Sequence, residues 1–391
     1  MSAGVEAAVV APVGGRLREL LRVSPGGPVE LGSIDPRSTP GLPGPEVTGE
    51  HRKGWARGQV ELVGAELGRQ QEMLFATAKA RAARADPTGL GGDLSGLGSA
   101  PARLGADPTG LGGDLSGLGS APARLGAEPP GRDDDPAGLG GGPAGLDPAG
   151  LGSAGVVGER PAGGDGRRVL LVLQAMDCGG KDGAIKRVAG AMNPLGLHIR
   201  SFGAPTAEEL RHHFLWRIRR ALPPPGYVGI FNRSHYEDVL VARVESLVPE
   251  PVWQARYDEI NAFERELAGT GVTLVKVLLH ISYAEQGERL LDRLADPRKH
   301  WKYDPADVDA RARWDAYQAA YAEALSRCGT PAAPWYVLPA DRKWYRDWAL
   351  AHLLRETFDT LQLGYPPAGF DVRHERERLL GPERSSQVNS R

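Results

Sequence analysis

The sequence has only two cysteines, Cys178 and Cys328, among its 391 residues. Two cysteines cannot form the disulfide framework of a small secreted protein, so we expect a reducing compartment. No apolar run is long enough to cross a bilayer, and the short apolar stretch near the N-terminus lacks the basic segment that begins a secretory signal. We therefore expect a cytoplasmic protein that does not bind a membrane.

An excess of charge of one sign is also missing. The chain has 47 Lys and Arg against 49 Asp and Glu, a formal net charge of -2. The net charge of the chain therefore does not attract it to nucleic acid, and we expect no nucleic-acid partner. Any affinity for a polyanion has to come from a local cluster of cations.

Glycine and proline are abundant, with 53 and 32 residues, but they are unevenly spread. Residues 85–105 recur without change as residues 106–126, and Gly, Pro, Ala, Leu and Asp dominate as far as residue 166. A solenoid is the alternative for such a repeat, but solenoids need about three or more repeats and a buried apolar face. Scattered leucines cannot offset the entropy of ordering so much glycine. The composition predicts that 83–166 is a disordered insertion.

The N-terminal residues 1–82 are expected to form an arm and a packing helix. Residues 22–47 are rich in Pro and Gly and should be extended rather than regular. Residues 55–82 place apolar side chains near a helical period, which predicts a helix packed on the core. The apolar positions are Val60, Val63, Leu67, Met73 and Leu74.

From residue 167 onward, short apolar runs alternate with amphipathic runs. This rhythm predicts an α/β fold in which a parallel sheet is sandwiched by helices on both faces. The core should span 167–364, and 365–391 should form a C-terminal tail. Thr206 with Glu209, and Ser282 with Glu285, fit capping boxes at helix starts. The expected strands are 169–174, 197–202, 227–231, 272–281 and 335–338, and the expected helices are 182–192, 206–221, 251–268, 283–294, 305–327 and 342–361.

The first candidate motif is QAMDCGGKDG at 174–183, where a buried strand runs into a glycine-containing turn that opens a helix. Backbone N–H groups and a helix N-terminus converge there, as in a phosphate-binding loop. Set against the P-loop pattern, Ala175 replaces the first glycine, and Asp182 stands where Ser or Thr would hold magnesium. Asp177 supplies a carboxylate instead, which suggests a site for Mg²⁺ beside a phosphate. The candidate phosphate-binding residues are Gly179, Gly180, Lys181, Asp182 and Gly183.

An ordinary strand-to-helix turn is the alternative for this loop. Cys178, which lies within it, is interpreted as a small loop filler rather than a nucleophile, because no partner base is evident.

The second motif is VGIFNRSHYEDVL at 228–240, a strand that ends in polar residues. Arg233 is a candidate phosphate contact, and Glu237 and Asp238 are candidate magnesium ligands. The spacing does not settle which of the two acids binds metal. A solvated charged turn is the alternative.

The third motif, RLLDRLADPRKHWKY at 289–303, holds five cations against the carboxylates of Asp292 and Asp296. Such a segment between two helices is expected to close over bound phosphates as a lid, at about 289–313. A solvated helix face is the alternative, and Trp301 is expected to pack in the core. The five cations are Arg289, Arg293, Arg298, Lys299 and Lys302, of which the last four are candidate phosphate contacts.

Together these motifs resemble those of the polyphosphate kinase 2 family. The family's phosphate loop is similar to LQAMDCGGKDG, its second motif is similar to GIFNRSHYEDVL, and its lid is similar to DPRKHWKYDPADVDARARWDAY. The resemblance covers about 22–82 and 167–362. It implies a P-loop kinase core with a helical lid. It also implies Mg²⁺-dependent phosphoryl transfer between inorganic polyphosphate and adenine nucleotides (AMP, ADP, ATP), and we expect a homo-oligomer.

The resemblance also implies roles for individual positions. Asp177 matches the loop aspartate that coordinates magnesium, and Lys181 matches the loop lysine that contacts phosphate. Arg233 matches the arginine that follows the strand of the family's second motif. Asp238, with Glu237 as a second candidate, falls in the acidic part of the second motif. Arg293, Lys299 and Lys302 fall in the lid and match its cations. The segment NRSHYEDVL is similar to the corresponding sequence of the subgroup that phosphorylates both AMP and ADP.

Two other functions stay open at this point. One is a nucleotide kinase that takes its phosphoryl group from an NTP. The other is a non-catalytic polyphosphate sensor on the same scaffold.

Overall fold

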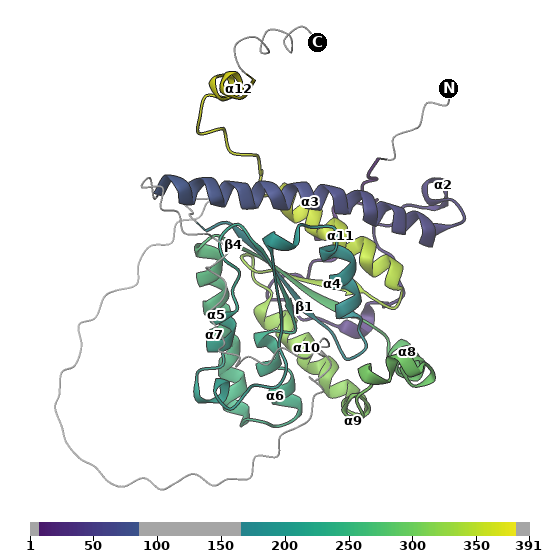
Figure 1. Cartoon of the computed structure of the whole chain (residues 1–391). Helices are drawn as coiled ribbons and strands as arrows, with labels where there is room; N and C mark the ends of the chain where they lie inside the picture. The colour runs from purple at the N-terminus through teal and green to yellow at the C-terminus, as the bar shows by residue number, and fades with distance from the viewer. Residues whose placement is uncertain (1–7, 86–165, 381–391) are drawn as a thin grey trace, which may run out of the picture.

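The computed structural model describes residues 8–85 and 166–380 (Figure 1). Of the predicted insertion 83–166, residues 86–165 lie outside these described residues, as does the end of the predicted tail from residue 381. The prediction is wrong for residues 83–85, which continue the helix Arg52–Ala85. Within the described ranges, no helix is both long enough and apolar enough to cross a membrane.

The centre of the fold is a sheet of five parallel strands in the order β2-β3-β1-β4-β5. All five expected strands are confirmed, each within one residue at either end. Their bounds are β1 (Arg168–Gln174), β2 (Leu197–Ser201), β3 (Val228–Asn232), β4 (Val272–His280) and β5 (Trp335–Pro339).

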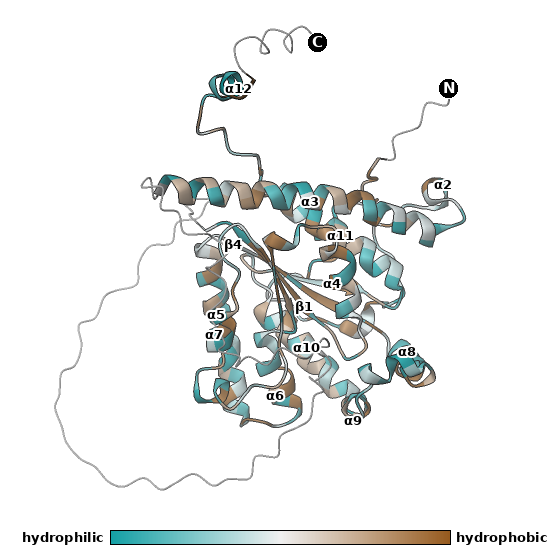
Figure 2. Cartoon of the chain, viewed as in Figure 1, coloured by the Kyte–Doolittle hydropathy of each residue, from teal (hydrophilic) through white to brown (hydrophobic). Residues whose placement is uncertain are grey.

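The central strand β1 is buried on both faces, which explains why it reads as a continuous apolar run rather than an alternating one. Val169, Leu171 and Leu173 belong to the hydrophobic cluster on one face, whereas Leu170 and Val172 belong to the cluster on the other. Figure 2 shows these apolar strands between helices that carry polar residues on their outer sides.

Helices cover both faces of the sheet, as predicted. α4 and α11 pack on one face, and α5 and α7 on the other (Figure 1). The helices are α1 (Leu17–Leu20), α2 (Pro45–Thr48), α3 (Arg52–Ala85), α4 (Lys181–Ala189), α5 (Trp216–Arg220), α6 (Val241–Val244), α7 (Glu250–Gly269), α8 (Tyr283–Ala295), α9 (Ala306–Ala312), α10 (Trp314–Cys328), α11 (Lys343–Asp359) and α12 (Val372–Leu380).

The long helix α3 packs along α11 (Figure 1). It begins before and ends after the predicted 55–82. Val63, Leu67 and Leu74 of the predicted apolar face are fully buried. The helix therefore adds a layer outside α11.

The predicted extended arm covers the edge of the sheet at β5. The amide of Val23 donates to the carbonyl of Trp335 at 2.9 Å, and the amide of Val337 donates to the carbonyl of Leu21 at 2.9 Å. The arm is not extended throughout, because it contains a short 3-10 helix at Leu31–Ser33 and the start of α2 at Pro45, which the composition did not reveal. Covering an edge strand in this way prevents it from pairing with another chain.

The predicted helix 206–221 is wrong. The structure has a 3-10 helix at Glu209–Arg211, and the helix α5 begins only at Trp216. The capping box does form, since the amide of Thr206 donates to Glu209 at 2.8 Å and the amide of Glu209 donates to Thr206 at 3.2 Å. However, no side chain from Thr206 to His213 is buried, and a helix without a packed face is not sustained.

The predicted helix 305–327 is divided in two. Arg313 leaves helical geometry, with φ -104° and ψ 27°, and separates α9 from α10. α10 packs in the core with Tyr321 and Leu325, whereas α9 belongs to the lid region near α8 (Figure 1). The break therefore lets one segment serve both the core and the lid.

Candidate active site

The predicted phosphate loop lies at the carboxyl edge of the sheet, between the end of β1 and the start of α4 at Lys181. β3 is the parallel neighbour of β1, so its last residues reach the same edge. The amide of Arg233 donates to the carbonyl of Leu173 at 3.0 Å, which holds the two strand ends together. The ends of parallel strands are where ligands bind in folds of this class.

A pocket of about 750 Å³ opens at this edge. Seven Lys and Arg residues and five Asp residues line it, so it favours an anion while offering oxygen ligands for a cation. It gathers most of the predicted site residues: Asp177, Gly179, Gly180, Lys181, Asp182, Gly183, Arg233, Arg293, Lys299 and Lys302.

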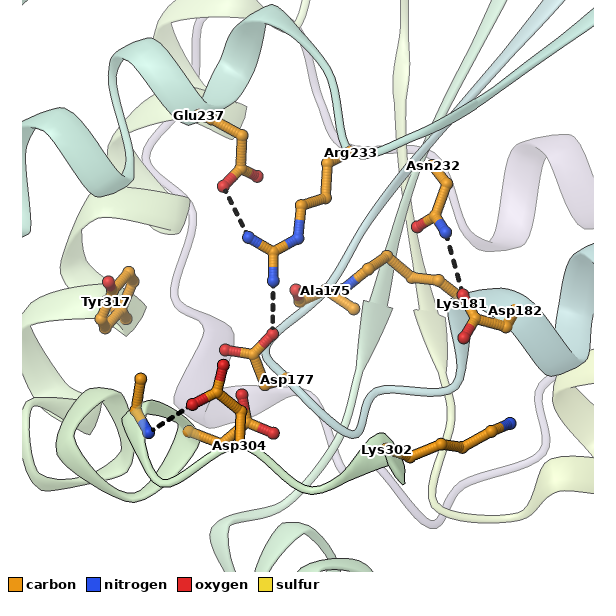
Figure 3. Close-up of polar contacts among 12 residues, drawn as sticks. Ala175, Asp177, Lys181, Asp182, Asn232, Arg233, Glu237, Lys302, Asp304 and Tyr317 are labelled. Atoms are coloured by element: carbon orange, nitrogen blue, oxygen red, sulfur yellow. Dashed lines mark hydrogen bonds and ion pairs between the residues drawn. The ribbon is translucent and has the colours of Figure 1, made fainter. Parts of the chain in front are cut away.

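Lys181 has a buried side chain at the base of the loop. Its ammonium donates to the carbonyl of Ala175 at 3.0 Å, within the same loop (Figure 3). Burial lowers the pKa of Lys181, and the nearby charge of Arg233 lowers it further. An anion bound beside this ammonium would supply a favourable counter-charge.

The guanidinium of Arg233 lies between two carboxylates (Figure 3). It is 2.6 Å from Asp177 and 3.4 Å from Glu237, and these charges, Glu237 first, raise the pKa of Arg233. The Arg233 backbone adopts a φ of 62°, a left-handed conformation that is strained for a residue with a side chain. Backbone strain of this kind is common at ligand-binding positions.

The loop itself contains two left-handed residues, Cys178 with φ 62° and Gly180 with φ 94°. Burial raises the pKa of the Cys178 thiol to about 11, so the thiol stays protonated near neutral pH. This protonation agrees with its interpretation as a loop filler. Beyond the loop, Asp182 accepts a hydrogen bond from the amide of Asn232 at 2.9 Å, which joins α4 to the end of β3 (Figure 3).

The predicted lid brings three of its four candidate phosphate contacts to the pocket. Arg293 on α8 donates to the carbonyl of Lys302 at 2.7 Å and to Asp307 at 3.1 Å, so it joins α8 to α9. Arg298 is different: its side chain is 89% exposed and forms an ion pair with Asp296. The structure therefore does not place Arg298 in the pocket.

The structure also does not bring Asp238 to the pocket. Its carboxylate lies 3.3 Å from Arg256 and 3.7 Å from Arg217, away from the phosphate loop, and burial raises its pKa. Glu237 and Asp238 lie in a 3-10 helix, His235–Asp238, in which successive side chains point about 120° apart. Glu237 therefore faces Arg233, while Asp238 faces the other side.

The expectation that Trp301 packs in the core is wrong. Trp301 is 61% exposed and lines the pocket, with the ammonium of Lys302 4.8 Å from its ring centre. By contrast, Trp335 and Trp348 are buried in the core.

One pocket residue that the motifs did not reveal is Asp307, on α9. Burial, and then the charge of Asp177, raise the pKa of Asp307 to about 6. Two carboxylates that repel each other in this way can share a divalent cation. Over the described ranges, no group of three or more His, Cys, Asp or Glu residues is arranged to hold a metal by itself.

Comparisons with known proteins agree with this geometry. A family model described as Polyphosphate kinase 2 matches residues 159–363. An AMP/ADP-polyphosphate phosphotransferase of Meiothermus ruber is 52% identical over 199 residues, which cover 51% of this chain and 74% of the relative. An ADP-polyphosphate phosphotransferase of Rhodopseudomonas palustris is 42% identical over 210 residues, covering 51% of this chain and 73% of the relative.

A solved structure is also similar. The crystal structure of polyphosphate kinase 2 from Arthrobacter aurescens TC1 superimposes with a TM-score of 0.69 at 34% sequence identity. The match covers 95% of this chain and 99% of that one.

Proposed function

Because the chain belongs to the polyphosphate kinase 2 family, we infer that it is a phosphotransferase that moves a phosphoryl group between inorganic polyphosphate and a nucleotide. The observation that carries this inference is the cationic pocket at the carboxyl end of β1, where Lys181, Arg233 and the lid cations converge. A chain of phosphates needs several cations along one cavity, and this pocket supplies them.

The nucleotide substrates we propose are both AMP and ADP, with ATP as the product from ADP. The Meiothermus ruber relative, whose name includes both nucleotides, supports this choice at 52% identity. The segment NRSHYEDVL of the second motif also supports it, through its resemblance to the subgroup that uses both acceptors.

For the reaction, we propose that Lys181 and the N–H groups of the loop bind the terminal phosphoryl group of polyphosphate. The transition state of phosphoryl transfer is loose, so positioning and charge neutralisation account for most of the acceleration. Arg233, already oriented by Asp177 and Glu237, is placed to neutralise charge on the transferred group. Arg293, Lys299 and Lys302 of the lid would neutralise the neighbouring phosphates.

Phosphotransferases generally use a divalent metal ion, and we propose Mg²⁺ held by Asp177 with Asp307. The carboxylate oxygens of these residues are the ligand type that Mg²⁺ prefers, and phosphate and water would complete the coordination. The raised pKa of Asp307 supports this assignment, because a bound cation would relieve its repulsion by Asp177. When bound, the ion would neutralise charge on phosphoryl oxygens.

A donor exchange tests the proposed function. The purified chain is mixed with ADP, inorganic polyphosphate and Mg²⁺, without any NTP, and ATP formation is followed by ³¹P NMR. We expect ATP to form, to stop forming when EDTA is added, and AMP to be converted to ADP under the same conditions. A requirement for an NTP donor would contradict the proposal, and so would polyphosphate binding without turnover.

A further inference from the structure

Three buried side chains donate hydrogen bonds to the outward-facing carbonyls of the phosphate loop. Gln286 donates to the carbonyl of Asp177 at 3.0 Å, and Arg289 to that of Cys178 at 2.8 Å. Arg346, from α11, donates to the carbonyl of Gly180 at 3.0 Å. The three donor side chains are 0%, 6% and 3% exposed, so the donors themselves are buried.

Each donor is itself held by further partners. The side-chain oxygen of Gln286 accepts from Arg311 at 3.1 Å. Arg289 also donates to the carbonyl of Ala340 at 2.7 Å and to Glu285 at 2.8 Å, and Arg346 also donates to Asp347 at 2.6 Å. Their orientations are therefore set independently of the loop.

The backbone of the loop is shaped to accept these donors. A Cβ atom added to Gly180 would lie 2.1 Å from a guanidinium nitrogen of Arg346, so the glycine allows the arginine to contact the backbone directly. Gly180 also has a φ of 94°, which residues with side chains rarely adopt.

These bonds fix which way the peptide groups of the loop face. In a trans peptide the C=O of one residue and the N–H of the next point in opposite directions. Turning the carbonyl of Asp177 toward Gln286 therefore turns the N–H group of Cys178 the other way, to the side of the pocket. The carbonyl of Gly180 accepts both from Arg346 at 3.0 Å and from the amide of Ala184 at 3.1 Å, and together these bonds turn the N–H group of Lys181 the other way. The N–H of Gly179 is used within the turn, since it donates to the carbonyl of Met176 at 2.9 Å.

We propose that Gln286 and Arg346 are positioning residues, which hold the N–H groups of Cys178 and Lys181 toward a bound phosphate, while Arg289 fixes the turn between them. This inference rests on the proposed function of the same pocket. Glu285 and Asp347 offset much of the charge of the two arginines, and Gln286 has no charge. The effect is therefore chiefly one of orientation.

The same face of α8 connects the loop with the lid. Gln286 contacts the loop on one side and Arg311 of α9 on the other, and Arg293 of the same helix contacts Asp307 of α9. A substitution at Gln286 therefore removes one contact that the loop and the lid share.

The test uses Gln286→Met, which removes the donor with little change in volume and none in charge. Its matched control is Gln59→Met, since Gln59 is also buried and donates to a carbonyl, that of Ala8 at 3.1 Å, far from the pocket. Binding of inorganic polyphosphate without nucleotide is measured by calorimetry, together with kcat, KM for polyphosphate and Tm. We expect Gln286→Met to weaken polyphosphate binding and to lower kcat by about 10-fold each, because a misoriented peptide group misplaces the phosphoryl group. Gln59→Met should lower Tm and change neither polyphosphate binding nor kcat.

Arg346→Met and Arg346→Lys provide a second test of the same inference if Gln286→Met fails to fold. Lysine keeps a donor that can reach the carbonyl of Gly180, so Arg346→Lys should recover part of the polyphosphate affinity that Arg346→Met loses. Variants that lower Tm but keep wild-type binding, KM and kcat would overturn the inference. Failure of the proposed function looks different, because the wild-type chain would then form no ATP from polyphosphate.

Discussion

Two groups of charged side chains near the carboxyl half of the sheet are built in opposite ways. On β4, the ammonium of Lys276 donates to Glu264 at 2.6 Å, to Tyr236 at 2.8 Å and to the carbonyl of Cys328 at 2.7 Å. We call Lys276, Glu264 and Tyr236 the Lys276 cluster. Each of these side chains is at most 1% exposed, and all three hydrogens of the ammonium group have acceptors.

The pocket cluster of Asp177, Lys181, Arg233 and Asp307 has no such closure. Lys181 donates to one loop carbonyl, Arg233 divides its guanidinium between carboxylates, and the charge of Asp177 raises the pKa of Asp307. Removing one partner from a closed group of buried charges leaves another charge uncompensated, whereas an open group can gain a counter-charge from a ligand. We propose from this difference that the Lys276 cluster serves structure and the pocket cluster serves phosphate binding.

The largest expected effect comes from opening the closed cluster. Lys276→Met leaves the carboxylate of Glu264 buried without its main counter-charge, which should lower the free energy of unfolding by about 3–5 kcal/mol. Activity per folded molecule should stay within about 2-fold. Urea denaturation measures the change, with Lys79→Met on the exposed face of α3 as a control. A wild-type unfolding curve would show that the cluster is not structural.

The next effect comes from the open cluster. Lys181→Ala should lower kcat by about 100-fold to 1000-fold, as expected when a donor to the transition state is removed. Its free energy of unfolding should not fall, because a buried cation is removed along with its desolvation cost. The control is Lys186→Ala, an exposed lysine on the same helix, for which we expect wild-type turnover. Near-normal turnover in Lys181→Ala would exclude Lys181 from the mechanism.

A smaller effect should appear in the dependence of stability on pH. The pKa of Asp307 is raised to about 6, above its unfolded value of about 3.9, so its stabilising contribution is complete below pH 4 and lost as the pH rises through 6. Asp307→Asn should therefore be more stable than the wild type at pH 8, by up to about 3 kcal/mol, and similar to it near pH 4.

Urea denaturation at the two pH values measures this difference. Millimolar Mg²⁺ should reduce the difference at pH 8, because the ion would stabilise the ionised wild type. A pH-independent difference between the two chains would argue against repulsion between Asp177 and Asp307.

The sequence predicted the strands, the loop and the helices on both faces because local patterns encode them. Apolar runs such as that of β1 and the glycine turn before Lys181 carry their information within a few residues. The sequence did not reveal Asp307, Gln286 or Arg346, because their contacts with the loop depend on how distant helices pack. Spacing also did not separate Glu237 from Asp238, since only the 3-10 helix decides which of them faces Arg233.

The most direct test of the difference between the clusters is a double-mutant cycle of Lys181→Ala and Lys276→Met, with kcat and the free energy of unfolding measured for each chain. We predict that kcat falls only in the chains that lack Lys181, that stability falls only in those that lack Lys276, and that the double variant shows both effects without coupling beyond about 0.5 kcal/mol. A loss of kcat in Lys276→Met as large as that in Lys181→Ala would contradict the assignment of one cluster to structure and the other to phosphate.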